Sequence, residues 1–113
     1  MIEITTYQNY YIAKIKVAEA NMEQSDLFKQ ELINELDSGH THILISFEDV
    51  NYIDSSFLGA LVSTLKHALA IGGDIAVYGL NENISQLFEL IRMNKVFKVF
   101  KDLPSSYQAD WIA

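Results

Sequence analysis

The chain of 113 residues has room for a single domain over residues 1–113, and it holds 8 basic and 15 acidic residues, a formal net charge of -7, and no cysteine. The acidic balance repels a nucleic-acid backbone, and the missing cysteines exclude disulfide frameworks, thiolate metal sites and thiol nucleophiles. Because there is no basic leader and no apolar run near the roughly 20 residues of a membrane span, we expect a cytoplasmic protein without membrane insertion.

The first half of the chain predicts two strands, a helix and a further strand. Residues 2–6 and 10–17 are rich in β-branched and aromatic side chains, which favours a hairpin. Apolar residues then recur at helical spacing from Ser25, which can cap the first turn, to Gly39, which can end the last one. The short continuous apolar run 42–47 is typical of a central strand covered on both faces.

The second half continues this alternation. Helices are predicted over 55–71 and 84–91, strands over 74–78 and 96–100, and a short final helix over 105–111. The first of these helices has an apolar stripe that should face the sheet, made of Leu58, Leu61, Val62, Leu65 and Leu69. Strands alternating with helices imply an α/β domain with a mostly parallel sheet, to which the initial hairpin adds an antiparallel edge.

The segment Asp54-Ser55-Ser56 falls where a loop leaving a strand meets the N-terminus of the second helix. Such a position leaves backbone N–H groups unpaired and carries a partial positive charge, so an anion is stabilised there. A phosphate on Ser55 could accept hydrogen bonds from those N–H groups at little cost to the fold. Asp54 or Ser55 can also act simply as the helix cap, worth about 1 kcal/mol, and the two roles are compatible.

Small side chains continue from Ser55 along the helix. Ser56, Gly59, Ala60 and Ser63 are expected opposite the apolar stripe, where their low surface would let the backbone of a partner protein approach closely. The alternative is chance, because alanine and serine are common in helices. This face is a candidate contact surface for a kinase or another docking partner.

Catalysis and metal binding are not predicted. Asp54 is the only general base near Ser55 in sequence, and the histidines His40, His42 and His67 do not form an evident triad, so Ser55 is interpreted as a substrate and the protein as a non-enzyme. His40 and His42 could point to one side of a strand as metal ligands, but no third ligand accompanies them. We therefore expect structural histidines, no bound metal and no cofactor.

Four segments carry a resemblance to a known family: His42 to Val50, Tyr52-Ile53-Asp54-Ser55-Ser56-Phe57-Leu58-Gly59, Gly72 to Val77, and Leu87 to Leu90. In order and spacing they resemble the STAS domain, shared by anti-sigma-factor antagonists and the cytoplasmic tails of sulfate transporters. The resemblance covers nearly the whole chain. It implies a single STAS-like domain with a mixed four- to five-stranded sheet and about four helices packed on it.

The resemblance also implies a function. Ser55 matches the family's phosphorylation site, Ser56 its usual neighbour and Asp54 the flanking acidic residue. Free-standing members of this size are similar to antagonists in partner switching, which bind an anti-sigma serine kinase when unphosphorylated and are released when phosphorylated, here on Ser55. A phosphatase, expected to be of the PP2C type, would reset the cycle.

Two positions depart from the family pattern. Phe57 stands where the family commonly has glycine, and Ala18-Glu19-Ala20-Asn21 stands for the usual Gly-Glu-Leu-Asp. That loop helps to build the same surface in the family. The expected partner-binding residues are therefore Glu19, Asn21, Asp54, Ser55, Ser56, Phe57, Gly59, Ala60 and Ser63.

Two other functions are kept as alternatives. One is a non-phosphorylated STAS scaffold or accessory subunit of a larger complex, for example in lipid transport. It would use the same helix face as a constitutive contact, and an exposed Phe57 would favour it. A sensor of nucleotide or lipid would need a phosphate loop or a basic pocket, and the sequence offers neither.

Overall fold

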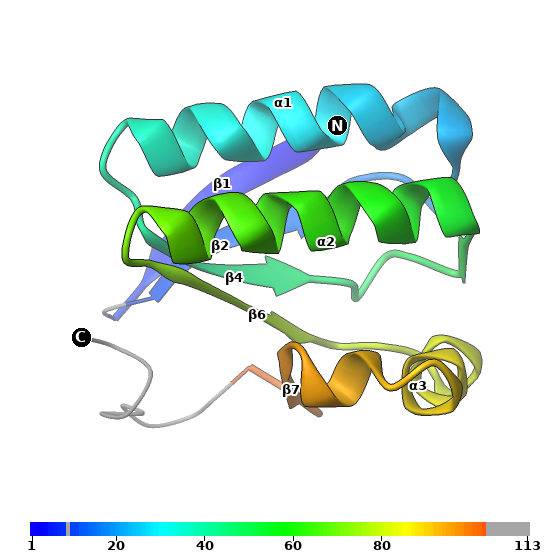
Figure 1. Ribbon diagram of the computed structural model, residues 1–113. Coiled ribbons are helices and arrows are strands. Elements are labelled where there is room, and N and C mark those ends of the chain that lie inside the picture. The colour runs from blue at the N-terminus through cyan, green and yellow to red at the C-terminus, as the bar shows by residue number, and fades with distance from the viewer. Residues whose placement is uncertain (9, 104–113) are drawn as a thin grey trace.

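Strands and helices alternate along the chain, as the hydrophobic periodicity predicts (Figure 1). The computed structural model describes residues 1–8 and 10–103. Its strands are β1 (Ile2–Tyr7), β2 (Tyr10–Ile15), β3 (Glu19–Ala20), β4 (His42–Ser46), β5 (Tyr52–Ile53), β6 (Asp74–Tyr78) and β7 (Lys98–Phe100). Its helices are α1 (Met22–Asp37), α2 (Ser55–Ala70), α3 (Glu82–Leu90) and the short 3-10 helix η1 (Met93–Lys95). The helix predicted at 105–111 lies outside the described residues.

The main sheet has five strands in the order β1-β2-β4-β6-β7. β1 pairs with β2 antiparallel, and the other three pairings are parallel, which confirms the predicted mixed sheet with an antiparallel hairpin at its edge. A second sheet was not foreseen: the two-residue strands β3 and β5 pair in parallel away from the main sheet.

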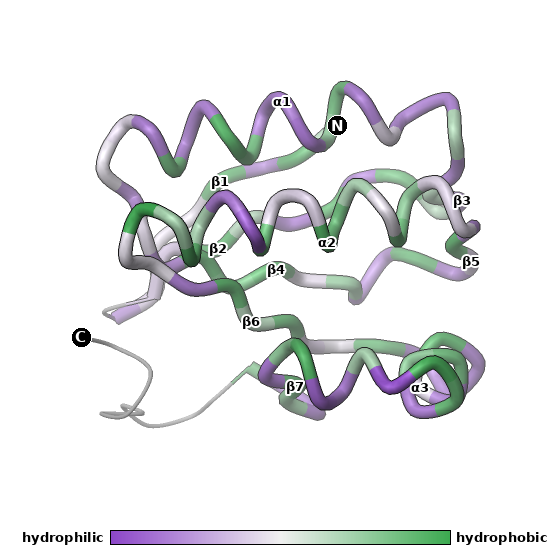
Figure 2. Tube along the Cα trace, in the orientation of Figure 1, coloured by the Kyte–Doolittle hydropathy of each residue, from purple (hydrophilic) through white to green (hydrophobic). Residues whose placement is uncertain are grey.

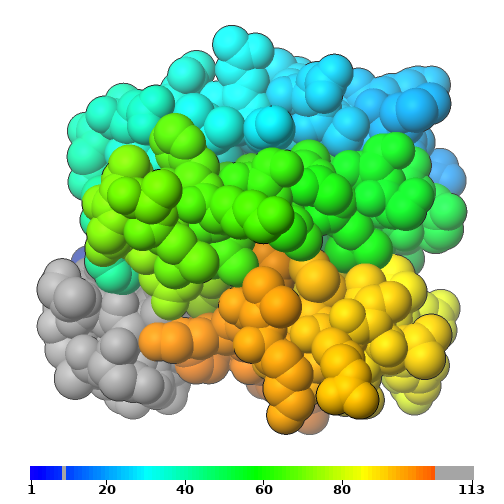
Figure 3. Space-filling view, in the orientation of Figure 1, coloured from blue at the N-terminus to red at the C-terminus, as the bar shows by residue number. Residues whose placement is uncertain are grey.

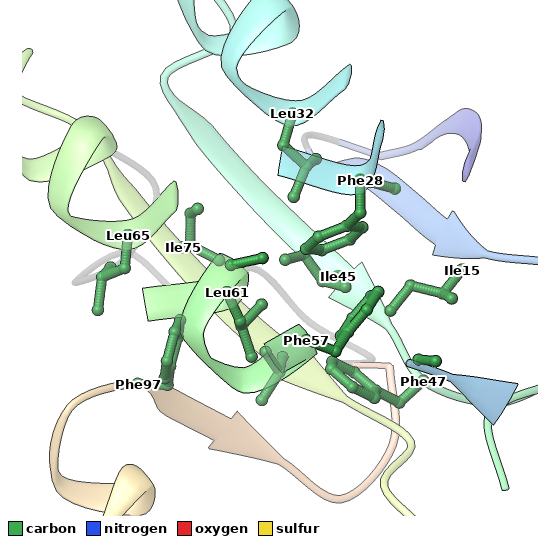
Figure 4. Close-up of a cluster of buried hydrophobic side chains, with 14 of the residues drawn as sticks. Ile15, Phe28, Leu32, Ile45, Phe47, Phe57, Leu61, Leu65, Ile75 and Phe97 are labelled. Carbon is green, nitrogen blue, oxygen red and sulfur yellow. The ribbon is translucent and has the colours of Figure 1, made fainter. Parts of the chain in front are cut away.

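The main core lies between the sheet and the helices. α1 and α2 lie side by side over the sheet, and the hydrophobic residues of α1 gather on its side toward the strands (Figures 1 and 2). Phe28 and Leu32 from α1 meet Ile45 and Phe47 from the centre of the chain, all fully buried (Figure 4). Phe57, near the start of α2, packs on Phe28 of α1, and this contact holds the N-terminus of α2 against α1. Among the described residues, no helix is both long and apolar enough to cross a bilayer.

The N-terminus of α1 differs from the prediction. Asn21, not Ser25, is the cap: its side chain accepts a hydrogen bond from the Glu23 N–H at 2.9 Å, and its own N–H donates to the Gln24 side chain at 3.1 Å. Ser25 is buried inside the helix, and its hydroxyl donates to the Met22 carbonyl. The helix starts earlier because this capping box satisfies its first turn before the apolar repeat begins.

The inward face of α2 and the start of the last strand differ in part from the prediction. Leu61 and Leu65 are buried as predicted, and Leu58 and Val62 are partly buried against the core, but Leu69 is 56% exposed, so its place in the predicted stripe is wrong. The last strand begins at Lys98 instead of residue 96, because a turn follows η1: the N–H groups of Val96 and Phe97 both donate to the Met93 carbonyl.

The helix stop at Gly72-Gly73 is confirmed. Gly72 has φ +82, a conformation that glycine adopts without strain, and a Cβ at Gly73 would lie 2.0 Å from the Thr41 carbonyl oxygen. Only glycine therefore allows β6 to start beside β4 at this point.

Candidate functional site

The N-termini of α1 and α2 meet at one carboxylate. Asp54 has extended backbone angles, and its Oδ1 accepts a hydrogen bond from the Phe57 N–H at 2.9 Å, so Asp54 rather than Ser55 caps α2. Its Oδ2 accepts a second hydrogen bond, also at 2.9 Å, from the N–H of Met22, the first residue of α1. A single side chain thus neutralises donors at the positive ends of two helices.

The loop before α1 is bound to the loop before α2 by backbone hydrogen bonds. The Ala18 carbonyl accepts from the N–H groups of Asn51 and Tyr52 at 2.7 and 3.1 Å, and the Asp54 N–H donates to the Ala20 carbonyl at 3.1 Å. The parallel β3–β5 ladder between these bonds pairs Glu19 with Tyr52 and Ala20 with Ile53. Residues 18–22 therefore lie directly beside the start of α2.

Ser55 and Ser56 form the first two positions of α2, and both are exposed. In the part of the chain that the structure describes, neither hydroxyl bonds to another protein group, and the Asp54 carboxylate takes the N–H of Phe57 but not those of the two serines. The first N–H groups of a helix have no partner within it. An anion carried by Ser55 would therefore meet unpaired donors and the positive end of the helix.

Phe57 and Ala60 correct the predicted contact surface. Phe57 is 0% exposed, and its ring centroid lies 4.4 Å from that of Phe28 on α1. Figure 4 shows both rings in the buried cluster, and Ala60 is only 7% exposed. Both face the core, so the assignment of these two residues to a partner surface is wrong. The ring of Phe57 is buried, whereas Ser55 is exposed.

The other predicted contact residues stay accessible. Glu19, Ser56 and Gly59 are exposed, and Asn21, Asp54 and Ser63 are half-buried. A Cβ built on Gly59 would have no heavy atom within 4 Å, so the space above this turn of α2 is open. The accessible small-residue face consists of Ser55, Ser56, Gly59 and Ser63.

Two exposed apolar side chains lie beside this face; Met22 ends the loop 18–22 that the sequence indicated as a contact, whereas Tyr52 was missed. Met22 is 69% exposed at the start of α1, and Tyr52 is 56% exposed on β5. The alternation of Tyr52 with the buried Ile53 was the available signal, since successive strand residues point to opposite sides. Exposed apolar residues next to a small-residue face are typical of a protein contact surface.

The three histidines and Tyr11 take structural positions elsewhere. The His40 ring stacks on Tyr11 at 3.9 Å, His42 Nδ1 lies 3.1 Å from the Thr41 hydroxyl, and His67 Nε2 lies 2.7 Å from an Asp37 oxygen. Within residues 1–8 and 10–103, no three His, Asp or Glu side chains come together as metal ligands would. Burial, assisted by a hydrogen bond to Glu35, raises the pKa of Tyr11 to about 12.

The double cap makes a measurable prediction. We expect Asp54→Ala to lower the free energy of unfolding by about 2–3 kcal/mol, because α2 loses its cap and Met22 loses a hydrogen bond to a charged group. Asp54→Asn should lose only about half as much, since an amide oxygen can cap α2 while its NH2 group cannot accept from the Met22 N–H. Urea denaturation measures both, and a loss below about 0.5 kcal/mol for Asp54→Ala would contradict the double cap.

Comparison with known proteins places these features in a family. The model of the STAS domain matches residues 2–106. A protein of Thermotoga neapolitana named as a putative anti-sigma factor antagonist is 30% identical over 91 residues, 80% of each chain. The anti-sigma-B factor antagonist of Staphylococcus aureus is 28% identical over 98 residues, 87% of this chain and 90% of that one.

The fold has solved counterparts as well. A crystal structure from Thermotoga maritima, of a protein with the same description as the Thermotoga neapolitana relative, superposes with a TM-score of 0.78 at 25% identity. The alignment covers 90% of this chain and 87% of that chain.

Proposed function

Since the chain belongs to the STAS domain family, we propose that it is an anti-sigma factor antagonist that binds an anti-sigma serine kinase and is released when Ser55 is phosphorylated. STAS antagonists of this kind are regulatory binding proteins and not enzymes. The names of the relatives support the antagonist role. The observation that carries the switch is the exposed Ser55 hydroxyl at the first position of α2.

The fold can accept a phosphate at this position. A negative charge at a helix N-terminus is stabilised by about 0.3–1 kcal/mol when exposed. This gain opposes the repulsion from the neighbouring Asp54 carboxylate. Phosphorylation is therefore expected to leave the domain folded, so that its main effect falls on binding.

Phosphorylation of Ser55 is expected to act on the contact between this protein and its partner. The proposed contact surface, which we call the α2 start face, consists of Glu19, Asn21, Asp54, Ser55, Ser56, Gly59 and Ser63. In an unmodified contact the small Ser55 side chain lets the partner approach the backbone of α2. A phosphate there occupies that space and brings a charge that the partner must desolvate, which weakens the complex.

Mass spectrometry tests the modification directly. After incubation with ATP and the serine kinase encoded beside it or purified with it, the protein is expected to gain a single phosphate, located by peptide analysis on Ser55. Ser55→Ala should gain none, and Ser56→Ala, the matched control on the next residue, should still be modified. A PP2C-type phosphatase should then remove the group.

The alternative outcome is equally informative. No phosphate on Ser55 in the presence of a kinase shown to be active would contradict the switch and favour a constitutive scaffold in a larger complex. The feature expected to favour a scaffold, an exposed Phe57, is not found, because that ring is buried in the core.

A further inference from the structure

A small pocket lies between β5, with the residue before it, and α3. Its volume is about 200 Å³, and it is lined by Asn51, Tyr52, Ile53, Asn83, Ile84 and Leu87. Of these residues, Ile53 and Ile84 are buried, whereas Tyr52 and Asn83 are exposed. In Figure 3, α3, in yellow and orange, borders α2, in green, on the face shown.

The two walls of the pocket are held in place by Asn81. Its Oδ1 accepts a hydrogen bond from the Ile84 N–H at 2.8 Å and caps α3. Its Nδ2 donates to the Asn51 carbonyl at 3.1 Å, and to the Val50 carbonyl at 3.4 Å. The start of α3 is thereby fixed to the chain just before β5. The pocket is thus formed in the unbound protein, which lowers the cost of filling it.

The size of the pocket limits what it can hold. Small-molecule sites usually enclose about 300–1,000 Å³, more than this pocket provides. A dry apolar cavity of about 150 Å³ is large enough for a benzene molecule. A volume of about 200 Å³ therefore fits one apolar side chain, such as leucine, methionine or phenylalanine, better than it fits a metabolite.

The pocket is continuous with the α2 start face. Tyr52 forms one wall, pairs with Glu19 across the β3–β5 ladder, and lies two residues before Asp54. A protein that covers Ser55 and Glu19 would therefore also reach the exposed ring of Tyr52. Binding energy in protein interfaces concentrates where an apolar or aromatic anchor fills such a preformed pocket.

We propose that this pocket receives one apolar anchor side chain of the same kinase that contacts Ser55, with Tyr52 packing against that anchor. The assignment rests on the proposed function, because it takes the partner from there. It divides recognition into two parts: the pocket supplies affinity, and Ser55 supplies the control by phosphorylation.

The test fills the pocket without changing Ser55. Asn83→Trp places a ring at the rim, and it is expected to weaken kinase binding at least about tenfold by isothermal titration calorimetry. Gln86→Trp is the matched control, since Gln86 is exposed on the same helix but does not line this pocket, and its affinity should stay within about twofold of the wild type. Tyr52→Ala removes a wall and should also weaken binding about tenfold; it carries the test if Asn83→Trp fails to fold by circular dichroism.

The outcomes separate this proposal from the one it rests on. If the wild type binds the kinase and Ser55→Asp does not, while the folded pocket variants bind within about twofold of the wild type, the pocket assignment is wrong and the switch stands. If the unmodified wild type does not bind the kinase at all, the proposed function fails and the pocket assignment fails with it. Loss of binding in Asn83→Trp and Tyr52→Ala but not in Gln86→Trp supports the pocket.

Discussion

Phe57→Ala is expected to lower the free energy of unfolding by about 3–5 kcal/mol, the range found when a fully buried phenylalanine is truncated. The ring is 0% exposed and lies between α2 and α1 against Phe28, so its removal leaves a cavity that the two helices cannot readily close. For a domain of about this size, each kcal/mol lowers Tm by roughly 4–8 °C, so the change is easily seen by thermal unfolding followed by circular dichroism.

Phe57→Leu provides the control for this prediction. It keeps an apolar side chain at the same position and should cost clearly less, on the order of 1.5 kcal/mol. An exposed residue would change stability by no more than about 0.5 kcal/mol, so a small effect of Phe57→Ala would contradict the buried position. A large effect would explain why this chain can carry a bulky residue where the family commonly has glycine: the ring is part of the core.

Ser55→Asp is expected to weaken kinase binding by at least about a hundredfold, equivalent to about 2.8 kcal/mol, while Ser55→Ala binds within a few fold of the wild type. The aspartate places a charge where the partner must exclude water, whereas alanine only removes a hydroxyl that makes no hydrogen bond within the described chain. Titration calorimetry with the unmodified kinase measures both affinities.

A charge placed elsewhere controls for the general effect of added acidity. Gln30 is exposed on α1, outside the α2 start face, and Gln30→Glu adds the same single negative charge to a protein of net charge -7. This variant should bind as the wild type does. Equal affinities for Ser55→Ala and Ser55→Asp would show that Ser55 does not control the contact.

The topology and the position of Ser55 could be predicted because both depend on local patterns. The change from alternating to helical periodicity locates each strand and helix, and a polar Asp-Ser-Ser segment before an apolar helix indicates its N-terminus. The mixed sheet and the placement of Asp54 just before α2 agree with this reasoning.

Which side of α2 is buried could not be predicted with the same success, for a physical reason. This helix has apolar residues on more than one side, so two stripes one residue apart both satisfy a helical repeat. Packing against Phe28 selects the stripe that begins at Phe57, which turns Ala60 inward and Leu69 outward. Such a choice depends on a partner helix about thirty residues away along the chain, which the local pattern does not contain.

The β3–β5 ladder could not be predicted, because it has only two residue pairs, too few to give a periodic pattern in the sequence. The hydrogen bond from the Met22 N–H to Asp54 could not be predicted either, because Met22 lies 32 residues earlier in the chain. The cap itself is a local feature of α2, but its link to α1 exists only in the folded domain.

That link makes the two helix starts a single cooperative unit. If the first turn of α1 opens locally, Oδ2 of Asp54 loses its donor, and if the first turn of α2 opens, the carboxylate is no longer held in place for α1. The free energies of these two openings are therefore coupled. The coupling is reciprocal, so a group attached at Ser55 that changes the opening of α2 also changes the opening of α1 and the order of the loop 18–22.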